Sequence, residues 1–184
     1  MKNFLFLADG FEEIEALATV DVLRRAEMDV TMVAVKHEHT VTGAHGIPVI
    51  CDVTFKEADF SDSEWLILPG GMPGATNLHE FQALNDLLKV HAGKGRRVAA
   101  ICASPAVVLA ATGLLDGKEA TCYPGFETAL AAAGARYMTD AVVVDGNILT
   151  ANGPGTAIEF ALEIVKLTRG ESVSRSVSEG MLIF

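Results

Sequence analysis

The sequence is short of cysteine, of basic residues and of long apolar runs. Only three cysteines occur in 184 residues, Cys51, Cys102 and Cys122, an odd number at wide spacing. That spacing argues against a disulfide framework and against a cysteine-ligated metal. Without disulfides, a reducing, cytoplasmic location is the expected one.

Basic residues are outnumbered by acidic ones, 14 Lys and Arg against 24 Asp and Glu, which gives a net charge of −10. Binding of a phosphate backbone needs clustered Lys and Arg, so nucleic acid is not an expected partner. No run is long and apolar enough to span a membrane. The apolar stretch at the N-terminus meets Asp9 too early for a secretory signal.

The five histidines lack partners at metal-ligand spacing, so no metal site is expected. Most of them are predicted to be solvated residues of loops and helices. His45 is the one to watch, because glycines flank the turn in which it lies.

What the sequence does contain is a regular alternation of apolar runs and helical patterns. Half of the residues are hydrophobic, enough for a sizeable core, and the length fits one domain over 1–184. Alternating strands and helices predict an α/β fold, a doubly wound sandwich around a mostly parallel sheet. Strands are expected at 2–8, 29–35, 65–68, 97–101, 120–122, 141–144 and 148–151. Helices are expected at 12–27, 81–92, 105–111, 127–133, 157–168 and 171–179, and a small hairpin outside the main sheet between 36 and 53.

Four short segments follow predicted strands: Asp9-Gly10, Gly70-Gly71, Cys102, and the loop from Asn152 to Gly155. Ligands of such sheets bind at the carboxyl ends of the strands, near the point where the strand order reverses. The four segments are therefore expected to converge on one site.

Cys102 lies where the buried run 97–101 meets a helix that begins near Pro105. Such a strand-to-helix turn resembles the nucleophile elbow of hydrolases, with sulfur in place of oxygen. A helix N-terminus is expected to lower the pKa of the thiol from about 8.5. For Cys51 and Cys122, the inert core cysteine is the better interpretation.

Glu15 lies at the edge of the apolar face of the first helix. A carboxyl group buried there would have a raised pKa and could serve as a general acid–base beside a thiolate. The alternative is that Glu12, Glu13 and Glu15 only complement the positive end of the helix dipole. From the pattern alone, the alternative is favoured for any one of them.

Gly71 and Ala103 could offer backbone N–H groups to a developing oxyanion. Gly70-Gly71 could equally be a tight turn, whereas phosphate-binding loops have a different glycine spacing. Tyr123 could face the same crevice, although such a tyrosine more often packs at the edge of a core.

Together, Asp9-Gly10-Phe11-Glu12-Glu13-Ile14-Glu15, Leu68-Pro69-Gly70-Gly71, Ala99-Ala100-Ile101-Cys102-Ala103-Ser104-Pro105 and Asn152-Gly153-Pro154-Gly155-Thr156 closely resemble the ThiJ/PfpI superfamily. The branch most similar is that of the parkinsonism-associated deglycase and its bacterial relatives. The resemblance covers almost the whole chain.

The resemblance implies a flavodoxin-like fold, a homodimer, and an oxidisable cysteine at Cys102 beside a protonated Glu15. It implies that the amides of Gly71 and Ala103 form an oxyanion pocket, with Gly70, Tyr123 and Pro154 beside it. The activities it implies are cofactor-free conversion of methylglyoxal or glyoxal to a hydroxy acid, or repair of early glycation adducts. A redox-sensing or chaperone-like stress protein with little turnover is the alternative.

Two departures from the family pattern concern histidine. Protease-like members have a His directly after the nucleophile, where this chain has Ala103, so a Cys-His protease dyad is disfavoured. Some members have a His at the position of Tyr123. Without it, proton transfer falls to Glu15 or to water, and aldehyde turnover is expected to be slow.

Overall fold

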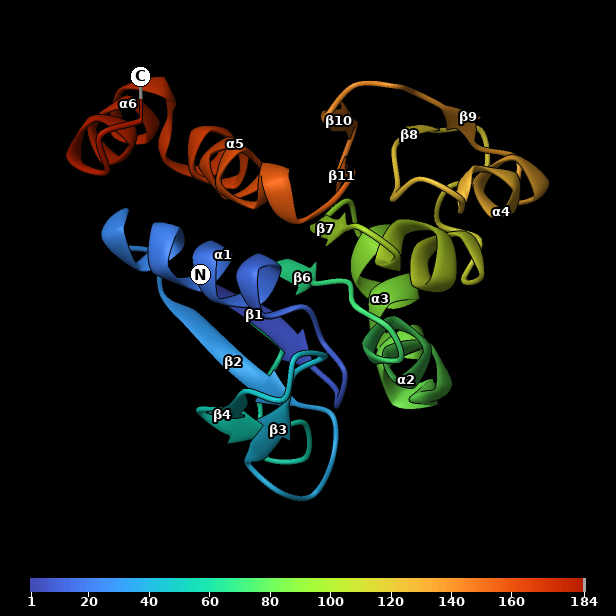
Figure 1. Cartoon of the computed structure of the whole chain (residues 1–184), viewed down its shortest axis with the longest axis horizontal. Helices are drawn as coiled ribbons and strands as arrows, with labels where there is room; N and C mark the ends of the chain where they lie inside the picture. Colours follow the sequence, from blue (N-terminus) through green and yellow to red (C-terminus); the bar gives the residue numbers. More distant parts are fainter. Residues whose placement is uncertain (184) are drawn as a thin grey trace.

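A seven-stranded sheet forms the centre of the molecule in the computed structural model, which describes residues 1–183. The strand order is β10-β11-β7-β6-β1-β2-β5, and every pair is parallel except the hairpin of β10 with β11. Helices cover both faces, α1, α5 and α6 on one side and α2 and α3 on the other (Figure 1). The predicted doubly wound α/β sandwich is confirmed.

The bounds of the elements follow the alternation expected from the sequence. The strands are β1 Lys2–Leu7, β2 Val30–Ala34, β3 Thr40–Thr42, β4 Pro48–Ile50, β5 Val53–Thr54, β6 Ser63–Leu68, β7 Arg97–Ile101, β8 Glu119–Ala120, β9 Arg136–Tyr137, β10 Val142–Asp145 and β11 Ile148–Ala151. The helices are α1 Glu13–Arg25, α2 Gly74–Glu80, α3 Gln82–Gly93, α4 Glu127–Ala132, α5 Ala157–Arg169 and α6 Glu171–Gly180, with a π-helical turn η1 at Pro105–Ala110 and a 3₁₀ turn η2 at Pro154–Thr156.

The core lies in two layers, one on each face of the sheet. Successive side chains of a strand point to opposite faces. In β1, Leu5 and Leu7 therefore join the cluster under α1 and α5, whereas Phe4 and Phe6 join the cluster under α3 and η1. This two-sided burial explains why β1 is apolar at every position from Phe4 to Leu7 rather than at alternate ones.

The reversal of strand order falls between β1 and β6. From β1 the chain continues to β2 on one side, and later elements build outward through β6, β7 and β11 on the other. The carboxyl ends of β1, β6 and β7 therefore meet at one edge, where α1, Gly70 and Cys102 follow their strands.

The hairpin predicted between 36 and 53 is confirmed, because β3 pairs with β4 outside the main sheet. One prediction was wrong in its bounds. The strand expected at 120–122 is Glu119–Ala120, and it pairs with β9 in a separate two-stranded sheet. Helix α2, edge strand β5 and strand β9 were not predicted. None of the helices within residues 1–183 is both long and apolar enough to cross a membrane.

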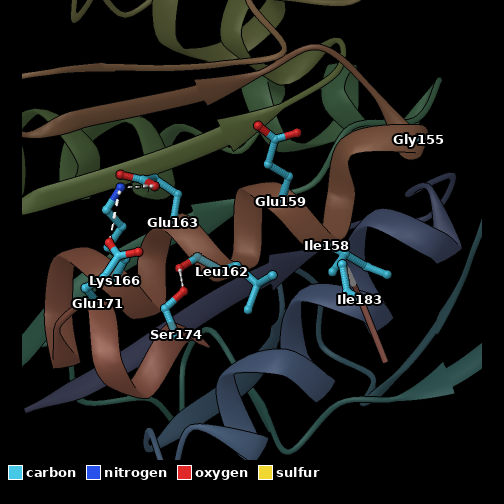
Figure 2. A pocket seen from close by; sticks show the side chains of 9 residues that line it. All are labelled: Gly155, Ile158, Glu159, Leu162, Glu163, Lys166, Glu171, Ser174 and Ile183. Carbon is cyan, nitrogen blue, oxygen red and sulfur yellow. Dashed lines mark hydrogen bonds and ion pairs between the residues drawn. The ribbon is translucent and has the colours of Figure 1, made fainter. Parts of the chain in front are cut away.

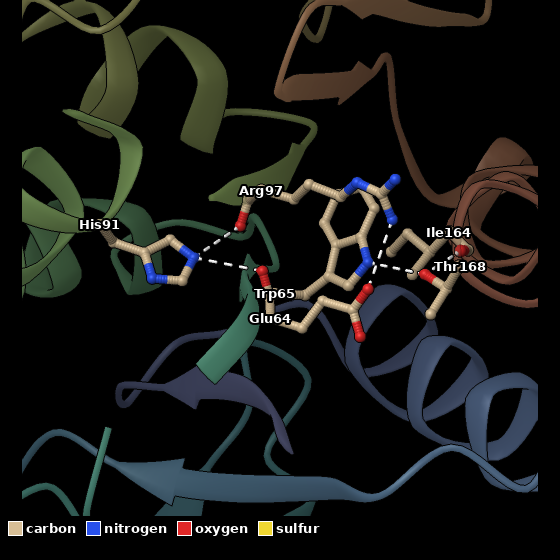
Figure 3. Close-up of polar contacts among 6 residues, drawn as sticks. All are labelled: Glu64, Trp65, His91, Arg97, Ile164 and Thr168. Atoms are coloured by element: carbon tan, nitrogen blue, oxygen red, sulfur yellow. Dashed lines mark hydrogen bonds and ion pairs between the residues drawn. The ribbon is translucent and has the colours of Figure 1, made fainter. Parts of the chain in front are cut away.

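At the amino ends of β6 and β7, a buried polar cluster ties helices to the sheet (Figure 3). His91, predicted to be solvated, is only 3% exposed, and its Nε2 donates to the carbonyls of Arg97 at 3.0 Å and Glu64 at 3.2 Å. Burial lowers the pKa of His91. On the other face, the Trp65 indole N–H donates to Thr168 of α5 at 2.8 Å. The cluster lies at the opposite end of the strands from Cys102.

Candidate active site

Glu15 is carried into the site by the first turn of α1. Glu12 is the N-cap, and its carboxylate accepts from the backbone N–H of Glu15 at 2.7 Å. The Glu15 side chain is fully buried, and one oxygen, Oε2, accepts from the backbone N–H of Gly70 at 2.7 Å. The other, Oε1, is buried with no hydrogen-bond partner within residues 1–183. A carboxyl group with one unsatisfied oxygen is suited to carry a proton there.

Burial is the largest influence on Glu15 and raises its pKa to about 7. The nearby charge of Glu12 also raises this pKa, whereas the Gly70 N–H and the Cys102 thiol lower it. The structure thus favours the buried acid–base over a mere complement to the helix dipole. Sequence alone had favoured the second interpretation.

Gly70 allows β6 and β7 to end in close contact. A Cβ at this position would lie 2.5 Å from the Cβ of Cys102 and 2.9 Å from Glu15 Oε2. Any side chain would therefore separate the carboxyl from the thiol. The next residue, Gly71, has φ +89°, a conformation that favours glycine, and it passes close to Gly10 and Glu12.

Cys102 itself occupies a strained position. Its φ is +66°, in the left-handed region that a non-glycine residue adopts at a cost of about 1–3 kcal/mol. Its N–H donates to the Ala151 carbonyl at 2.9 Å, and its carbonyl accepts from the Tyr123 N–H at 2.8 Å. These two bonds hold the elbow in place, and the side chain remains 7% exposed.

Two backbone N–H groups are directed at the sulfur, those of Gly71 and Ala103, and both lower the pKa of Cys102. Gly71 follows β6 and Ala103 follows β7, so the two amides act on the sulfur from the ends of neighbouring strands. Such a pair of donors is the arrangement expected of an oxyanion pocket.

The expected net lowering of the thiol pKa was wrong. Burial, followed by the charge of Glu15, raises the pKa of Cys102 to about 12. The helix behind it is a single π-helical turn, and the amides of Gly71 and Ala103 do not offset the burial. Because the thiol and the carboxyl influence each other, they titrate as a pair. Near pH 7 the thiol is protonated and Glu15 is about half ionised, so the pair holds a single proton, on sulfur, only above that pH.

The DJ-1/PfpI family model matches residues 1–167. The chain belongs to this family. It is 38% identical over 177 residues to Protein DJ-1 homolog A of Arabidopsis thaliana, covering 96% of this chain but 45% of that protein. The chain thus spans about half the length of its Arabidopsis relative.

Shorter relatives match nearly end to end. Glutathione-independent glyoxalase DJR-1.2 of Caenorhabditis elegans is 36% identical and is matched over 90% of this chain and 87% of its own. The structure titled "Toxoplasma gondii DJ-1, oxidized" has a TM-score of 0.93 at 35% identity, with 98% of this chain and 97% of that one covered.

In this DJ-1/PfpI chain, the backbone hydrogen bonds of Cys102 connect the elbow to Tyr123 and to Ala151, the strand end that precedes the loop with Pro154. Tyr123 is 44% exposed, and its ring lies against Gly153, where an added Cβ would be 3.1 Å from Tyr123 Cδ2. The loop with Gly153 and Pro154 follows Ala151, the acceptor of the Cys102 N–H. The predicted convergence of strand ends is therefore confirmed as geometry, and the roles of Tyr123 and Pro154 in substrate binding stay predictions.

His45 belongs to a contact that sequence spacing could not find. Its backbone N–H and its Nδ1 both donate to the carboxylate of Glu13, at 2.7 and 2.8 Å. The carboxylate raises the pKa of His45. Burial alone would raise the pKa of Glu13, but the bonds from His45 lower it overall. Ligand atoms of Glu12, Glu13 and His45 lie within 4.8 Å of one another. Both Glu13 oxygens are already satisfied by His45, so the cluster is explained as a clasp between α1 and the hairpin.

A cavity of about 520 Å³ lies elsewhere, between α5 and α6 (Figure 2). Glu159, Glu163 and Lys166 of α5 line it, and Lys166 pairs with Glu163 and Glu171. Of the predicted site segments, only Gly155 reaches it. The cavity therefore adds no reactive group to the site at Cys102.

The raised pKa of Glu15 predicts a pH-dependent cost in stability. A carboxyl whose pKa rises from 4.5 to about 7 on folding loses stability as pH rises through that range. Relative to wild type, Glu15→Gln should therefore gain on the order of 2 kcal/mol between pH 5 and pH 8. Urea unfolding followed by fluorescence of Trp65, the single tryptophan, measures this difference. A difference that does not change with pH would contradict the raised pKa, since His45 and His91 titrate in both proteins.

Proposed function

We propose that this chain is a cysteine-dependent, cofactor-free enzyme of the glyoxalase or deglycase type, acting on methylglyoxal, glyoxal or early glycation adducts. The observation that carries the proposal is the convergence of Cys102, the Gly71 and Ala103 amides, and the buried carboxyl of Glu15. The family and the name of the Caenorhabditis elegans relative support it.

In the proposed reaction, Cys102 Sγ adds to the aldehyde carbon of methylglyoxal while its proton passes to Glu15. The new oxyanion accepts from the amides of Gly71 and Ala103 and then takes the proton back from Glu15, which gives a hemithioacetal and an ionised carboxylate. Glu15 next takes the proton from the former aldehyde carbon and returns it to the former ketone carbon. The hydroxyl proton moves from the first oxygen to the second in the same rearrangement, which leaves a thioester. Water cleaves the thioester and releases lactate, so the sum is methylglyoxal plus water to lactate.

The resting pair suits this order of events. Because the thiol is protonated and Glu15 has a pKa of about 7, the carboxylate can accept the proton as the sulfur attacks. Lactate formed from methylglyoxal without glutathione is the direct test. No lactate above the uncatalysed rate would overturn the glyoxalase form of the proposal.

The second candidate is a redox sensor in which Cys102 stops at the sulfenic or sulfinic stage. Cys102 is 7% exposed, whereas Cys51 and Cys122 are 2% and 1% exposed. The similar Toxoplasma structure, named as oxidised, also supports a redox role. Mass spectrometry after mild peroxide should find oxidation mainly at Cys102, with little aldehyde turnover. Equal oxidation of all three free cysteines would count against it.

A homodimer and a cytoplasmic location complete the proposal. Exposed apolar residues gather on α1 and on the β3–β4 hairpin: Ile14 is 58% exposed, Ile47 50% and Ile50 74%. The hairpin contacts α1 through His45 and Glu13, so the two can form one surface. A second copy covering that surface would bury these side chains.

Ile14→Glu should therefore yield a monomer, because burying an unpaired carboxylate at the interface is costly. We expect the dimer dissociation constant to rise about 100-fold or more. Light scattering after size-exclusion chromatography measures it. The control is Val90→Glu, at a residue 55% exposed on α3 in the opposite helix layer. A dimer that survives Ile14→Glu would place the interface elsewhere.

A further inference from the structure

Ser104 lies two residues after Cys102 and looks in sequence like a helix cap. A capping serine has extended backbone and accepts from an N–H of the first helical turn. Ser104 instead has φ −64° and ψ −33°, already helical, and makes no capping bond. Its hydroxyl is fully buried and donates to the carbonyl of Pro69 at 2.6 Å. The hydroxyl therefore bridges η1 to the end of β6.

The Pro69 carbonyl belongs to the same planar peptide unit as the Gly70 N–H. That N–H donates to Glu15 Oε2 at 2.7 Å. Ser104 and Glu15 thus hold the two polar ends of one peptide plane. Fixing the carbonyl also fixes the direction in which the N–H meets the carboxyl.

These contacts form a chain that begins at the elbow and ends at the carboxyl. It runs from Cys102 along the backbone to Ser104, across to Pro69, and through Gly70 to Glu15, whose pKa the Cys102 thiol lowers. Hydrogen bonds in series also polarise one another, so a donor on Pro69 strengthens the bond from the Gly70 N–H to an ionised Glu15.

We propose that Ser104 is a positioning residue that orients the Glu15 carboxyl toward Cys102 through the Pro69–Gly70 peptide. The inference rests on the proposed function of the Cys102–Glu15 pair and assigns Ser104 no contact with substrate. The charged and titratable groups that act on Glu15 are Glu12 of its own helix and Cys102 of the elbow. Neither is changed by a substitution at Ser104.

The test compares Ser104→Ala with Ser63→Ala. Ser63 is also buried and donates to a backbone carbonyl, that of Phe60, at 2.7 Å, but it lies at the far end of β6. Both variants should lose a similar amount of thermal stability. Only Ser104→Ala should lower kcat for lactate formation, by about three- to tenfold with KM within about twofold.

The second readout is the pH dependence of Cys102 alkylation by iodoacetamide. Loss of the Ser104 donor weakens the hydrogen bond that favours ionised Glu15, so the pKa of Glu15 should rise. The limb of the profile, meaning the pH range in which the alkylation rate follows the ionisation of Glu15, should therefore move to higher pH. Ser63→Ala should leave that limb in place. Unchanged profile and kcat in Ser104→Ala would overturn the proposal.

Two other outcomes can be told apart from failure of the positioning role: Ser104→Ala does not fold, or the proposed function is wrong. If Ser104→Ala does not fold, Ser104→Thr and Ser104→Val form a pair of similar shape that differs in the hydroxyl, and only Ser104→Thr should retain the wild-type profile. Identical profiles in that pair would also overturn the proposal. If the wild type forms no lactate but Ser104→Ala still shifts the alkylation limb, the positioning role stands and the aldehyde chemistry fails.

Discussion

Replacing Cys102 with Ser should reduce lactate formation from methylglyoxal by on the order of 10³-fold or more. The serine hydroxyl would occupy the same elbow and face the same amides of Gly71 and Ala103. Its proton is held far more tightly than that of a thiol, however, and Glu15 with a pKa near 7 cannot remove it efficiently. The measurement is kcat/KM without glutathione, at a pH above 7 where Glu15 is ionised.

Cys51→Ala and Cys122→Ala are the matched controls for Cys102→Ser. Both thiols are buried and, as at Cys102, burial raises their pKa to about 12. Neither has backbone amides that lower its pKa. Activity should therefore persist in both controls. Turnover that survives in Cys102→Ser would show that the aldehyde reacts elsewhere.

Glu15→Gln should lower kcat by about 10²- to 10⁴-fold while KM changes little. The amide oxygen of glutamine can still accept from the Gly70 N–H, so the local structure is retained. It cannot carry a proton from sulfur or between the two carbons of the substrate. Steady-state kinetics with methylglyoxal separates these effects, because a change confined to KM would indicate a binding role instead.

The pH profile adds a second constraint on Glu15. A base must be ionised before it accepts a proton, so wild-type kcat/KM should rise with pH through about 7 and then level off. Residual activity of Glu15→Gln should lack this limb. Glu13→Gln is the control, since that carboxylate bonds His45 and not the thiol. A limb near pH 7 that remains in Glu15→Gln would assign it to another group.

Much of the fold was predictable because its signals are local. After their first one or two residues, the runs that became β1, β6 and β7 are apolar, as is typical of strands covered on both faces. The turn between β10 and β11 contains Asp145-Gly146-Asn147, a typical hairpin sequence. The short strands β5, β8 and β9 have two residues each, too few for any periodicity to appear.

In the candidate site too, some residues could be predicted from local sequence and others could not. Cys102 was recognisable because a strand end, a reactive side chain and Pro105 lie within a few residues. The burial of Glu15 was not, since it depends on Gly70, which is 55 residues away in the chain. The same holds for the clasp of His45 with Glu13 and for Ser104, whose hydroxyl bonds the end of another strand.

By itself, the sequence determined the order of strands and helices, the family, and the cysteine at the elbow, because each depends on neighbouring residues. Only the tertiary structure decided the direction in which the pKa of the Cys102 thiol is shifted. Local reasoning predicted a thiol acidified by its helix, but packing buried it beside Glu15, and desolvation outweighed the two amides. Desolvation is a property of everything that surrounds a group, and no short stretch of sequence contains it.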